Sequence, residues 1–318
     1  MLQIFVNANY DFVGKRRWFY VASLAAVAVA LLSIAGHRGL NYGIDFTGGS
    51  LIQVRYDKPV TVAEVRRGLD DLKLGSAVIQ QFGDAREYLI RLPESEQKTG
   101  ELSARIQGAL GRAAGAQVEI RRMEFVGPQV GRDLQLQALY AVLAGMVGIL
   151  IYVAIRFDFR GGVISIAALA HDVIVALGAL SITSREMSLP VLAALLTIVG
   201  YSINDTIVVF DRIRENRGRG LRKGQSLADL VNGAINQTLS RTVLTSFTVF
   251  LSAFVLFLFG GEVLHDFAFA LLVGVITGTY SSIAAASLVL DWEVSGRTRA
   301  TAGAKLSVKA EEVAAKKS

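Results

Sequence analysis

Six apolar runs of membrane-spanning length constrain this chain more than any other feature. They lie at residues 18–36, 135–155, 162–183, 189–210, 239–259 and 266–290. A helix of about 20 apolar residues crosses a bilayer, where its backbone must satisfy its own hydrogen bonds. Of the 318 residues, 52% are hydrophobic and 19% are charged, whereas a soluble domain has about 25% charged residues. The sequence therefore predicts a polytopic α-helical membrane protein with six transmembrane helices.

The composition also excludes several classes of site. The chain has no cysteine and three histidines, so we expect no disulfide, no metal and no cofactor. The net charge of +6 is typical of basic loops beside a membrane, and we expect no nucleic-acid binding. The first run follows Lys15, Arg16 and Arg17 and is long enough to span, so we interpret it as a retained helix rather than a cleaved signal peptide.

Lysine and arginine gather in alternate connections, which sets the expected orientation. They occur before the first run, after the second and fourth runs, and in the tail. Because these residues mark the cytosolic side, both termini are predicted to be cytosolic. The expected organisation is a cytosolic segment 1–17, an extracytoplasmic domain 37–132, helices two to six within 133–292 with a basic cytosolic loop 211–238, and a disordered cytosolic tail 293–318.

The domain at 37–132 has a readable order of elements. Alternating and turn-bounded segments predict strands, and a capping box at Thr61 and Glu64 predicts the start of a helix. The expected order is an entry turn and then a strand within 43–56, helix 61–72, strands 77–82 and 88–92, helix 95–114 and strand 117–125. This β-α-β-β-α-β order predicts a ferredoxin-like α+β fold, which hosts many functions and identifies none.

Asp205 is a carboxylate inside the fourth apolar run. A charge at the centre of a membrane helix costs about 2.5–3.5 kcal/mol on insertion scales, so such a group needs a partner, a proton or a role. Tyr201 lies four residues before it and Ser202 three, and Asn204 is adjacent. We therefore expect these polar side chains to support Asp205 on a face that points into a helix bundle.

The fifth run carries a stripe of polar residues that could supply partners for Asp205. It consists of Thr238, Arg241, Thr245, Thr248 and Ser252. Arg241 stands near the cytosolic end, at a depth compatible with Asp205, and an ion pair would remove most of the burial cost of both charges. Two interpretations stay open for the pair, structural stabilisation or a proton relay. The stripe is either a packing face or a water path.

His171 and Asp172 lie near the middle of the third run. Neighbours on a helix point about 100° apart, so we expect one to face the bundle core and the other a second subunit or an aqueous cleft. Histidine changes charge near neutral pH, which suits a proton relay. A hydrogen-bonded core histidine is the alternative.

Small residues recur at every fourth position of the sixth run, at Gly274, Gly278, Ser282 and Ala286. This spacing lets helices approach closely. The seam is predicted to pack either within the chain or against a partner subunit.

Several stretches together resemble the SecF family. They are Gly43–Gly49 (GIDFTGG), Val126–Gly131 (VGPQVG), His171–Val173 (HDV), Gly200–Asn216 (GYSINDTIVVFDRIREN), Gln237–Thr242 (QTLSRT) and Gly278–Ser282 (GTYSS). The resemblance covers nearly all of residues 12–292, in order, while GIDFTGG is shared with SecD and 300–318 show nothing specific to the family.

The resemblance implies a half-transporter of the RND superfamily, in the bacterial inner membrane, that pairs with SecD and uses the proton-motive force. Its partners would be SecD, the SecYEG channel with its accessory subunits, the unfolded preprotein and membrane lipid. The family's proton-path aspartate and arginine match Asp205 and Arg241, and Asp172 matches a family motif. The expected function is therefore a non-enzymatic translocation subunit; the alternatives are a small-molecule efflux transporter and a passive translocon scaffold.

Overall fold

The computed structural model describes residues 5, 8–37, 39–82, 84–92, 99–156, 159–221 and 224–315, with the side chains of 99–102, 262–263 and 293–315 outside the description. The chain forms two compact units. We call residues 1–39, 144–183 and 193–318 the helical unit, and residues 40–143 and 184–192 the mixed unit.

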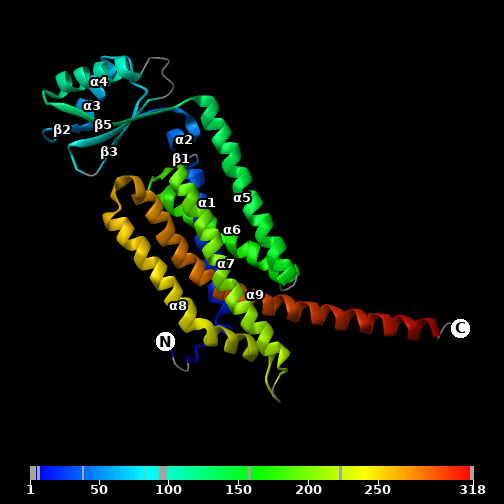
Figure 1. Ribbon diagram of the computed structural model, residues 1–318. Coiled ribbons are helices and arrows are strands. Elements are labelled where there is room, and N and C mark those ends of the chain that lie inside the picture. The colour runs from blue at the N-terminus through cyan, green and yellow to red at the C-terminus, as the bar shows by residue number, and fades with distance from the viewer. Residues whose placement is uncertain are drawn as a thin grey trace. The chain divides into compact units, whose positions relative to one another are not determined.

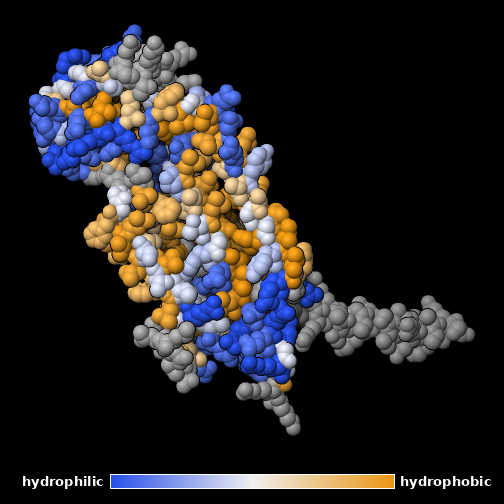
Figure 2. All heavy atoms as spheres, in the orientation of Figure 1, coloured by the Kyte–Doolittle hydropathy of each residue, from blue (hydrophilic) through white to orange (hydrophobic). Residues whose placement is uncertain are grey.

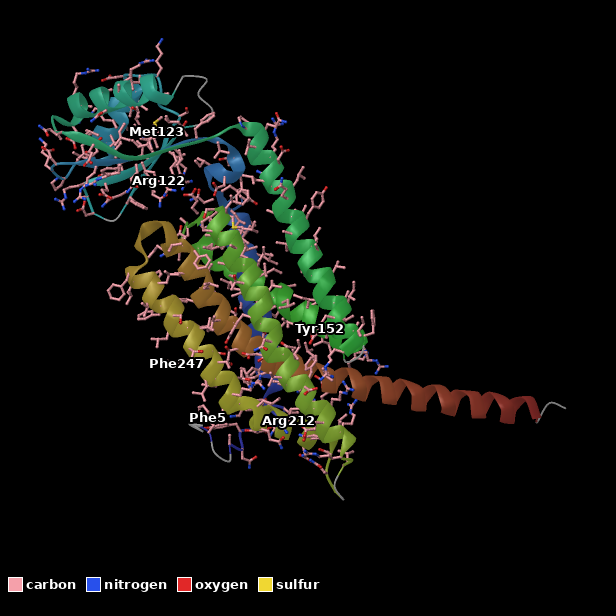
Figure 3. The ribbon with its side chains drawn as sticks, viewed as in Figure 1. Phe5, Arg122, Met123, Tyr152, Arg212 and Phe247 are labelled. Carbon is pink, nitrogen blue, oxygen red and sulfur yellow. The ribbon has the colours of Figure 1, made fainter. Side chains whose placement is uncertain are left out.

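Six helices of the described residues are long and apolar enough to cross a membrane, as the sequence predicts. They are α1 (Arg16–Gly36), α5 (Pro128–Arg156), α6 (Phe159–Ile182), α7 (Leu189–Gly218), α8 (Leu227–Phe259) and α9 (Gly261–Ala315), whose apolar part is Leu264–Trp292 (Figure 1). Figure 2 shows hydrophobic residues over most of the visible face of the helical unit. Large apolar side chains such as Tyr152 on α5 and Phe247 on α8 are 54% and 57% exposed (Figure 3).

Four helices are clearly longer than predicted, and the first of them, α5, begins at Pro128 rather than at residue 135. Residues 211–218 extend α7 and residues 227–238 begin α8, so the predicted loop 211–238 shortens to 219–226. A capping box of Ser226 and Asp229 starts α8. Helix α9 continues to Ala315, where a disordered tail was predicted. An apolar run marks only the lipid-facing part of a helix, and Arg, Glu, Lys and Ala extend it in water because they are good helix formers.

Close contacts hold the helical unit together. Helix α9 packs against α6 and α8, and α1 packs against α6. A Cβ on Gly178 would lie 2.2 Å from the Cβ of Ala30, so α6 and α1 can approach this closely only with glycine there. The Tyr280 hydroxyl of α9 donates to the Phe19 carbonyl of α1 at 2.5 Å. Helix α9 therefore contacts α1, α6 and α8.

The mixed unit contains the predicted β-α-β-β-α-β order. Its elements are β2 (Gly49–Tyr56), α3 (Val62–Asp70), β3 (Val78–Gln81), β4 (Glu87–Leu92), α4 (Thr99–Ala114) and β5 (Val118–Val126). The antiparallel sheet has the order β3-β4-β2-β5, which is the ferredoxin-like topology. Ile52, Ile90 and Leu110 are among the fully buried core side chains. The predicted capping box is present, and its hydrogen bonds from Thr61 hold the pKa of Glu64 below its ordinary value.

A second, smaller sheet of the mixed unit was not predicted. Strand β1 (Asn41–Tyr42) pairs in parallel with β6 (Glu186–Met187), which immediately precedes α7. Between β1 and β2, α2 (Ile44–Thr47) leads into Gly48 and Gly49, whose φ angles are +71° and +110°. Both angles favour glycine. The GIDFTGG stretch is therefore a structural junction.

Candidate functional site

Two buried carboxylates lie where α6, α7, α8 and α9 pack together. Small residues allow these helices to pack closely. A Cβ on Gly274 would stand 2.3 Å from the Ile198 side chain, and one on Gly278 would stand 3.1 Å from the Cβ of Ser202. The glycines of α9 thus lie directly against α7. This packing is within the chain; Ser282, the next residue of the predicted seam, is fully buried and bonds to the Thr279 carbonyl of its own helix.

Asp172 on α6 is 0% exposed and fully surrounded by donors. Its Oδ2 accepts hydrogen bonds from the hydroxyls of Ser202 on α7 at 2.6 Å and Ser281 on α9 at 2.8 Å. The Oδ1 atom lies 2.9 Å from Nδ1 of His171. Three helices therefore meet at one carboxylate, and its burial is offset by hydrogen bonds rather than by a fixed cation.

His171 was predicted to face away from Asp172, and this prediction was wrong. Its side chain is 12% exposed and its ring lies 6.4 Å from that of Tyr280. The two Cα–Cβ bonds diverge on the helix, but the imidazole is long enough to fold back onto the adjacent carboxylate. Within the described part of the chain, the buried Nε2 atom of His171 has no hydrogen-bond partner.

Asp205 on α7 is 2% exposed and has a sparser set of partners. Its Oδ2 accepts a hydrogen bond from the Ser246 hydroxyl of α8 at 3.2 Å. The Thr279 hydroxyl of α9 donates to Ser246 Oγ at 2.7 Å. The result is a hydroxyl chain that links α9 and α8 to the carboxylate. Tyr201, one turn earlier on α7, has a buried hydroxyl without a partner among the described residues.

The expected ion pair between Asp205 and Arg241 is not formed in the part of the chain that the structure describes. Arg241 is exposed, and Ser246, five residues later on α8, is the residue that reaches Asp205. Five residues turn a helix by about 500°, which places Arg241 about 140° from Ser246 around α8. The sequence predicted that Arg241 lies on the face of α8 that points into the bundle. The buried face of α8 runs instead through Thr238, Thr242 and Ser246.

The rest of the predicted stripe bonds to its own helix. The Thr245 hydroxyl donates to the Arg241 carbonyl at 3.0 Å and the Thr248 hydroxyl to the Thr245 carbonyl at 2.8 Å. Thr238 bonds in the same way to the Ala234 carbonyl at 3.0 Å. Thr248 and Ser252 are exposed. These bonds let hydroxyls lie in a membrane helix at little cost.

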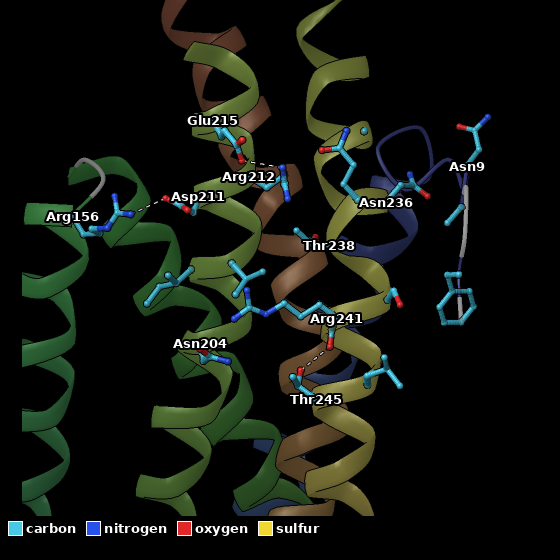
Figure 4. Close-up of a pocket in the computed structure, with 18 of the residues that line it drawn as sticks. Asn9, Arg156, Asn204, Asp211, Arg212, Glu215, Asn236, Thr238, Arg241 and Thr245 are labelled. Atoms are coloured by element: carbon cyan, nitrogen blue, oxygen red, sulfur yellow. Dashed lines mark hydrogen bonds and ion pairs between the residues drawn. The ribbon is translucent and has the colours of Figure 1, made fainter. Parts of the chain in front are cut away.

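Arg241 lines a cavity of about 1310 Å³ in the helical unit. Figure 4 shows its side chain extending from α8 toward α7. Asn204 also faces this cavity, whereas its neighbour Asp205 is buried behind the wall. The cavity holds two ion pairs, Arg156 with Asp211 at 2.8 Å and Arg212 with Glu215 at 2.9 Å. The Arg241 guanidinium in this cavity thus lies near the buried Asp205 carboxylate without forming an ion pair with it.

Sequence reasoning missed Ser246, Thr279 and Ser281. Their signal was present, because Ser281 and Thr279 belong to the small-residue helix α9 and Ser246 interrupts an apolar run. Only the packing shows which hydroxyls meet which carboxylate. Among the described residues there is no cluster of His, Cys, Asp or Glu that could hold a metal. The site thus contains two buried carboxylates, Asp172 and Asp205, and intramembrane carboxylates are a common feature of proton pathways.

Comparisons with known proteins give one consistent result. The family described as "Protein export membrane protein SecD/SecF, C-terminal" matches residues 106–295, and the "SecD/SecF GG Motif" matches residues 34–60. The protein translocase subunit SecF of Calditerrivibrio nitroreducens is 46% identical over 283 residues, which cover 88% of this chain and 93% of that protein. The corresponding subunit of Magnetococcus marinus is 47% identical over 307 residues, covering 95% and 98%.

A solved structure shares the architecture. The crystal structure of SecDF from Thermus thermophilus, described as a translocon-associated membrane protein, superimposes with a TM-score of 0.81 at 44% identity. The match covers 90% of this chain and 39% of that longer chain. The chain therefore spans about two fifths of the SecDF protein that it resembles.

Proposed function

The chain belongs to the SecD/SecF family of protein export membrane proteins, and on that premise we propose that it is the SecF-type subunit of a Sec protein-export complex. It is a multi-pass inner-membrane protein with a transport role. A SecD-type subunit supplies the other half of the complex. The fused SecDF relative, of which this chain matches a part, supports that pairing. SecYEG and the preprotein are the further partners in this proposal.

The burial of Asp205 among hydroxyls from two other helices is the observation that carries the mechanism. In the proposal, Asp205 takes up and releases a proton. Protonation removes the cost of a buried charge and lets the carboxyl donate as well as accept. It therefore changes which arrangement of α7, α8 and α9 is favoured. One charge crossing 100 mV provides about 2.3 kcal/mol, enough to shift such an equilibrium.

Arg241 sets the charge balance of the site in the proposal. In this structure Arg241 lines the cavity, and no ion pair with Asp205 forms among the described residues. A second state in which the guanidinium reaches Asp205 would stabilise the ionised carboxylate. Alternation between the two states would couple proton release to helix movement. Asp172 and His171 form a second group in the same relay, with the hydroxyls of Ser202 and Ser281 as its fixed donors.

In this proposal, the ferredoxin-like domain moves in response to proton exchange and acts on the preprotein. It lies on the outer side of the membrane and promotes a late step of preprotein translocation. Its orientation rests on the distribution of Lys and Arg in the sequence. No covalent chemistry is assigned to the chain.

The test replaces Asp205 with asparagine. Asp205→Asn should leave complex assembly intact and abolish the stimulation of translocation by a proton gradient, because the amide does not take up a proton. Asp211→Asn is the matched control, since Asp211 is an exposed carboxylate on the same helix, and it should retain stimulation. Normal stimulation in Asp205→Asn would contradict the relay and favour a passive scaffold.

A further inference from the structure

Arg91 is a charged residue buried in the sheet of the mixed unit, and two of its partners, Glu186 and Asn41, lie outside that sheet. It stands on β4 and is 9% exposed. Its guanidinium forms an ion pair with Glu186 of β6 at 2.5 Å and donates to the Asn41 side-chain oxygen of β1 at 2.9 Å. A third bond goes to the Gln80 side chain of β3 at 3.3 Å. A buried guanidinium with this many partners is fixed in place.

The segment that Arg91 holds leads directly into α7. Glu186 pairs with Asn41 in the two-stranded sheet, and the Gly43 amide donates to the Met187 carbonyl at 2.9 Å. A Cβ on Gly43 would lie 2.3 Å from Glu186 Oε1, so glycine leaves room for the ion pair. β6 is therefore held by an ion pair, by strand pairing and by close packing.

The first turn of α7 is held by the same junction. The Leu189 amide, at the start of α7, donates to Asp45 Oδ2 at 2.8 Å. A carboxylate at this position satisfies a free helix amide and interacts favourably with the helix dipole. Asp45 belongs to α2, between β1 and β2. The GIDFTGG stretch thus caps the helix that carries the candidate proton site.

Helix α7 is continuous from Leu189 to Gly218 and contains Asp205. Sixteen residues separate Leu189 from Asp205 (205 − 189), which is about four and a half helical turns. A continuous helix moves as one body over this length. Any shift of α7 that follows proton exchange therefore reaches its first turn, where Leu189 is bonded to Asp45, and the preceding Glu186, which is paired with Arg91.

We propose that the Arg91–Glu186 ion pair, with the Asp45 cap, is the coupling joint that passes movement of α7 to the ferredoxin-like domain. This inference rests on the proposed function. Arg91 and Glu186 are positioning residues: they touch neither the proton nor the client. Their loss should separate two activities that the intact protein links, proton uptake and translocation.

The experiment measures both activities in the full chain with its SecD-type partner and SecYEG, reconstituted in proteoliposomes with an imposed proton gradient. A pH-sensitive dye reports proton uptake and a protease-protection assay reports translocation of a preprotein. Arg91→Glu and Glu186→Arg should each keep proton uptake while the ratio of translocation to uptake falls roughly 5-fold or more, within the usual range of coupling free energies. The double reversal restores the ion pair in the opposite sense and should recover the ratio.

Matched variants separate coupling from folding. Arg86→Glu reverses a charge of an exposed ion pair in the same domain and should leave the ratio unchanged. Glu186→Gln keeps an oxygen acceptor and the side-chain shape, so it carries the test where a charge reversal fails to accumulate. It should lower the ratio at wild-type protein levels.

Two results would overturn the joint. One is a parallel loss of uptake and translocation in correctly assembled Arg91 and Glu186 variants, which a merely structural role would give. The other is an unchanged ratio. Asp205→Asn is measured alongside. If it leaves both activities intact, the proposed function fails, whereas an unchanged ratio in the Arg91 and Glu186 variants with a required Asp205 overturns the joint alone.

Discussion

The two buried carboxylates differ in how completely they are hydrogen-bonded. Asp172 lies within hydrogen-bonding distance of three side chains, two hydroxyls and an imidazole. Asp205 accepts a longer hydrogen bond, from the Ser246 hydroxyl at 3.2 Å. Each hydrogen bond that a buried carboxylate accepts offsets part of the free energy lost when the group leaves water. In the proposed relay, Asp172 therefore also holds three helices together, whereas Asp205 is the group that takes up and releases the proton.

This contrast predicts different effects on stability. In Asp172→Asn an amide NH₂ replaces one acceptor oxygen and the charge is lost, so the hydrogen bonds that link Ser202, Ser281 and His171 to this side chain weaken. Loss of a buried hydrogen bond to a charged group costs about 1–3 kcal/mol. We therefore expect a clear fall in the thermal unfolding temperature of the detergent-solubilised protein, and a smaller one in Asp205→Asn. A larger fall in Asp205→Asn would contradict the assignment.

At the same scale, the sequence identified Asp205 but not its neighbours. A carboxylate within an apolar run is recognisable from the sequence alone, because the free-energy cost of burying it in the membrane does not depend on its neighbours. The partner depends on the rotation of α8 about its axis. A stripe through Thr238, Arg241 and Thr245 and a face through Thr238, Thr242 and Ser246 share their first residue and differ by a fraction of a turn. Only the packing decides between them.

At the scale of elements, the approach of α9 to α7 determines the site. Ser202 and Ser281 reach the same oxygen of Asp172, which requires the two helices to be nearly in contact. The glycines of α9 permit this distance. The spacing of small residues predicted a close seam, and the structure assigns Gly274 and Gly278 to α7 of the same chain.

A single methyl group tests this seam. In Gly274→Ala the new Cβ would lie 2.3 Å from Ile198, which is fully buried and β-branched and so cannot swing away. Overpacking of this kind costs about 1–3 kcal/mol. Gly148→Ala in α5 is the matched control, since a Cβ there has no neighbour within 4 Å. It should stabilise the helix, by at most about 1 kcal/mol.

Thermal unfolding of both glycine variants in the same detergent provides the measurement. Equal unfolding temperatures for Gly274→Ala and Gly148→Ala would show that the seam tolerates a side chain. The comparison isolates the seam because both substitutions have the same intrinsic effect on helix propensity.

At the scale of the whole molecule, the class of fold followed directly from the sequence. Apolar runs predicted the six helices, and a change of periodicity together with a capping box predicted the α+β domain. The small sheet of β1 and β6 was not predictable, because its strands have two residues each and their paired residues are 145 positions apart (186 − 41). The Arg91–Glu186 pair depends on that sheet. Long-range pairings of short segments leave no periodic signal.

Orientation is the property of the whole molecule that most needs a direct test. The chain contains no cysteine, so each introduced thiol is the only one in the protein. Lys58→Cys places a thiol on the exposed surface of the mixed unit, and Leu221→Cys places one in the α7–α8 connection, where Leu221 is 51% exposed. A membrane-impermeant maleimide should label Lys58→Cys in spheroplasts and Leu221→Cys only in inverted vesicles.

The reason for this expectation lies in the charges of the connections. Arginines at 212, 214, 217 and 219 cluster at the end of α7, and basic connections remain on the cytosolic side during insertion. If Leu221→Cys were labelled in intact spheroplasts instead, the ferredoxin-like domain would lie in the cytosol. It could not then act on a preprotein at the outer side, and the coupling joint would have no client to move. The labelling pattern therefore decides whether the proton site and the domain can belong to one export cycle.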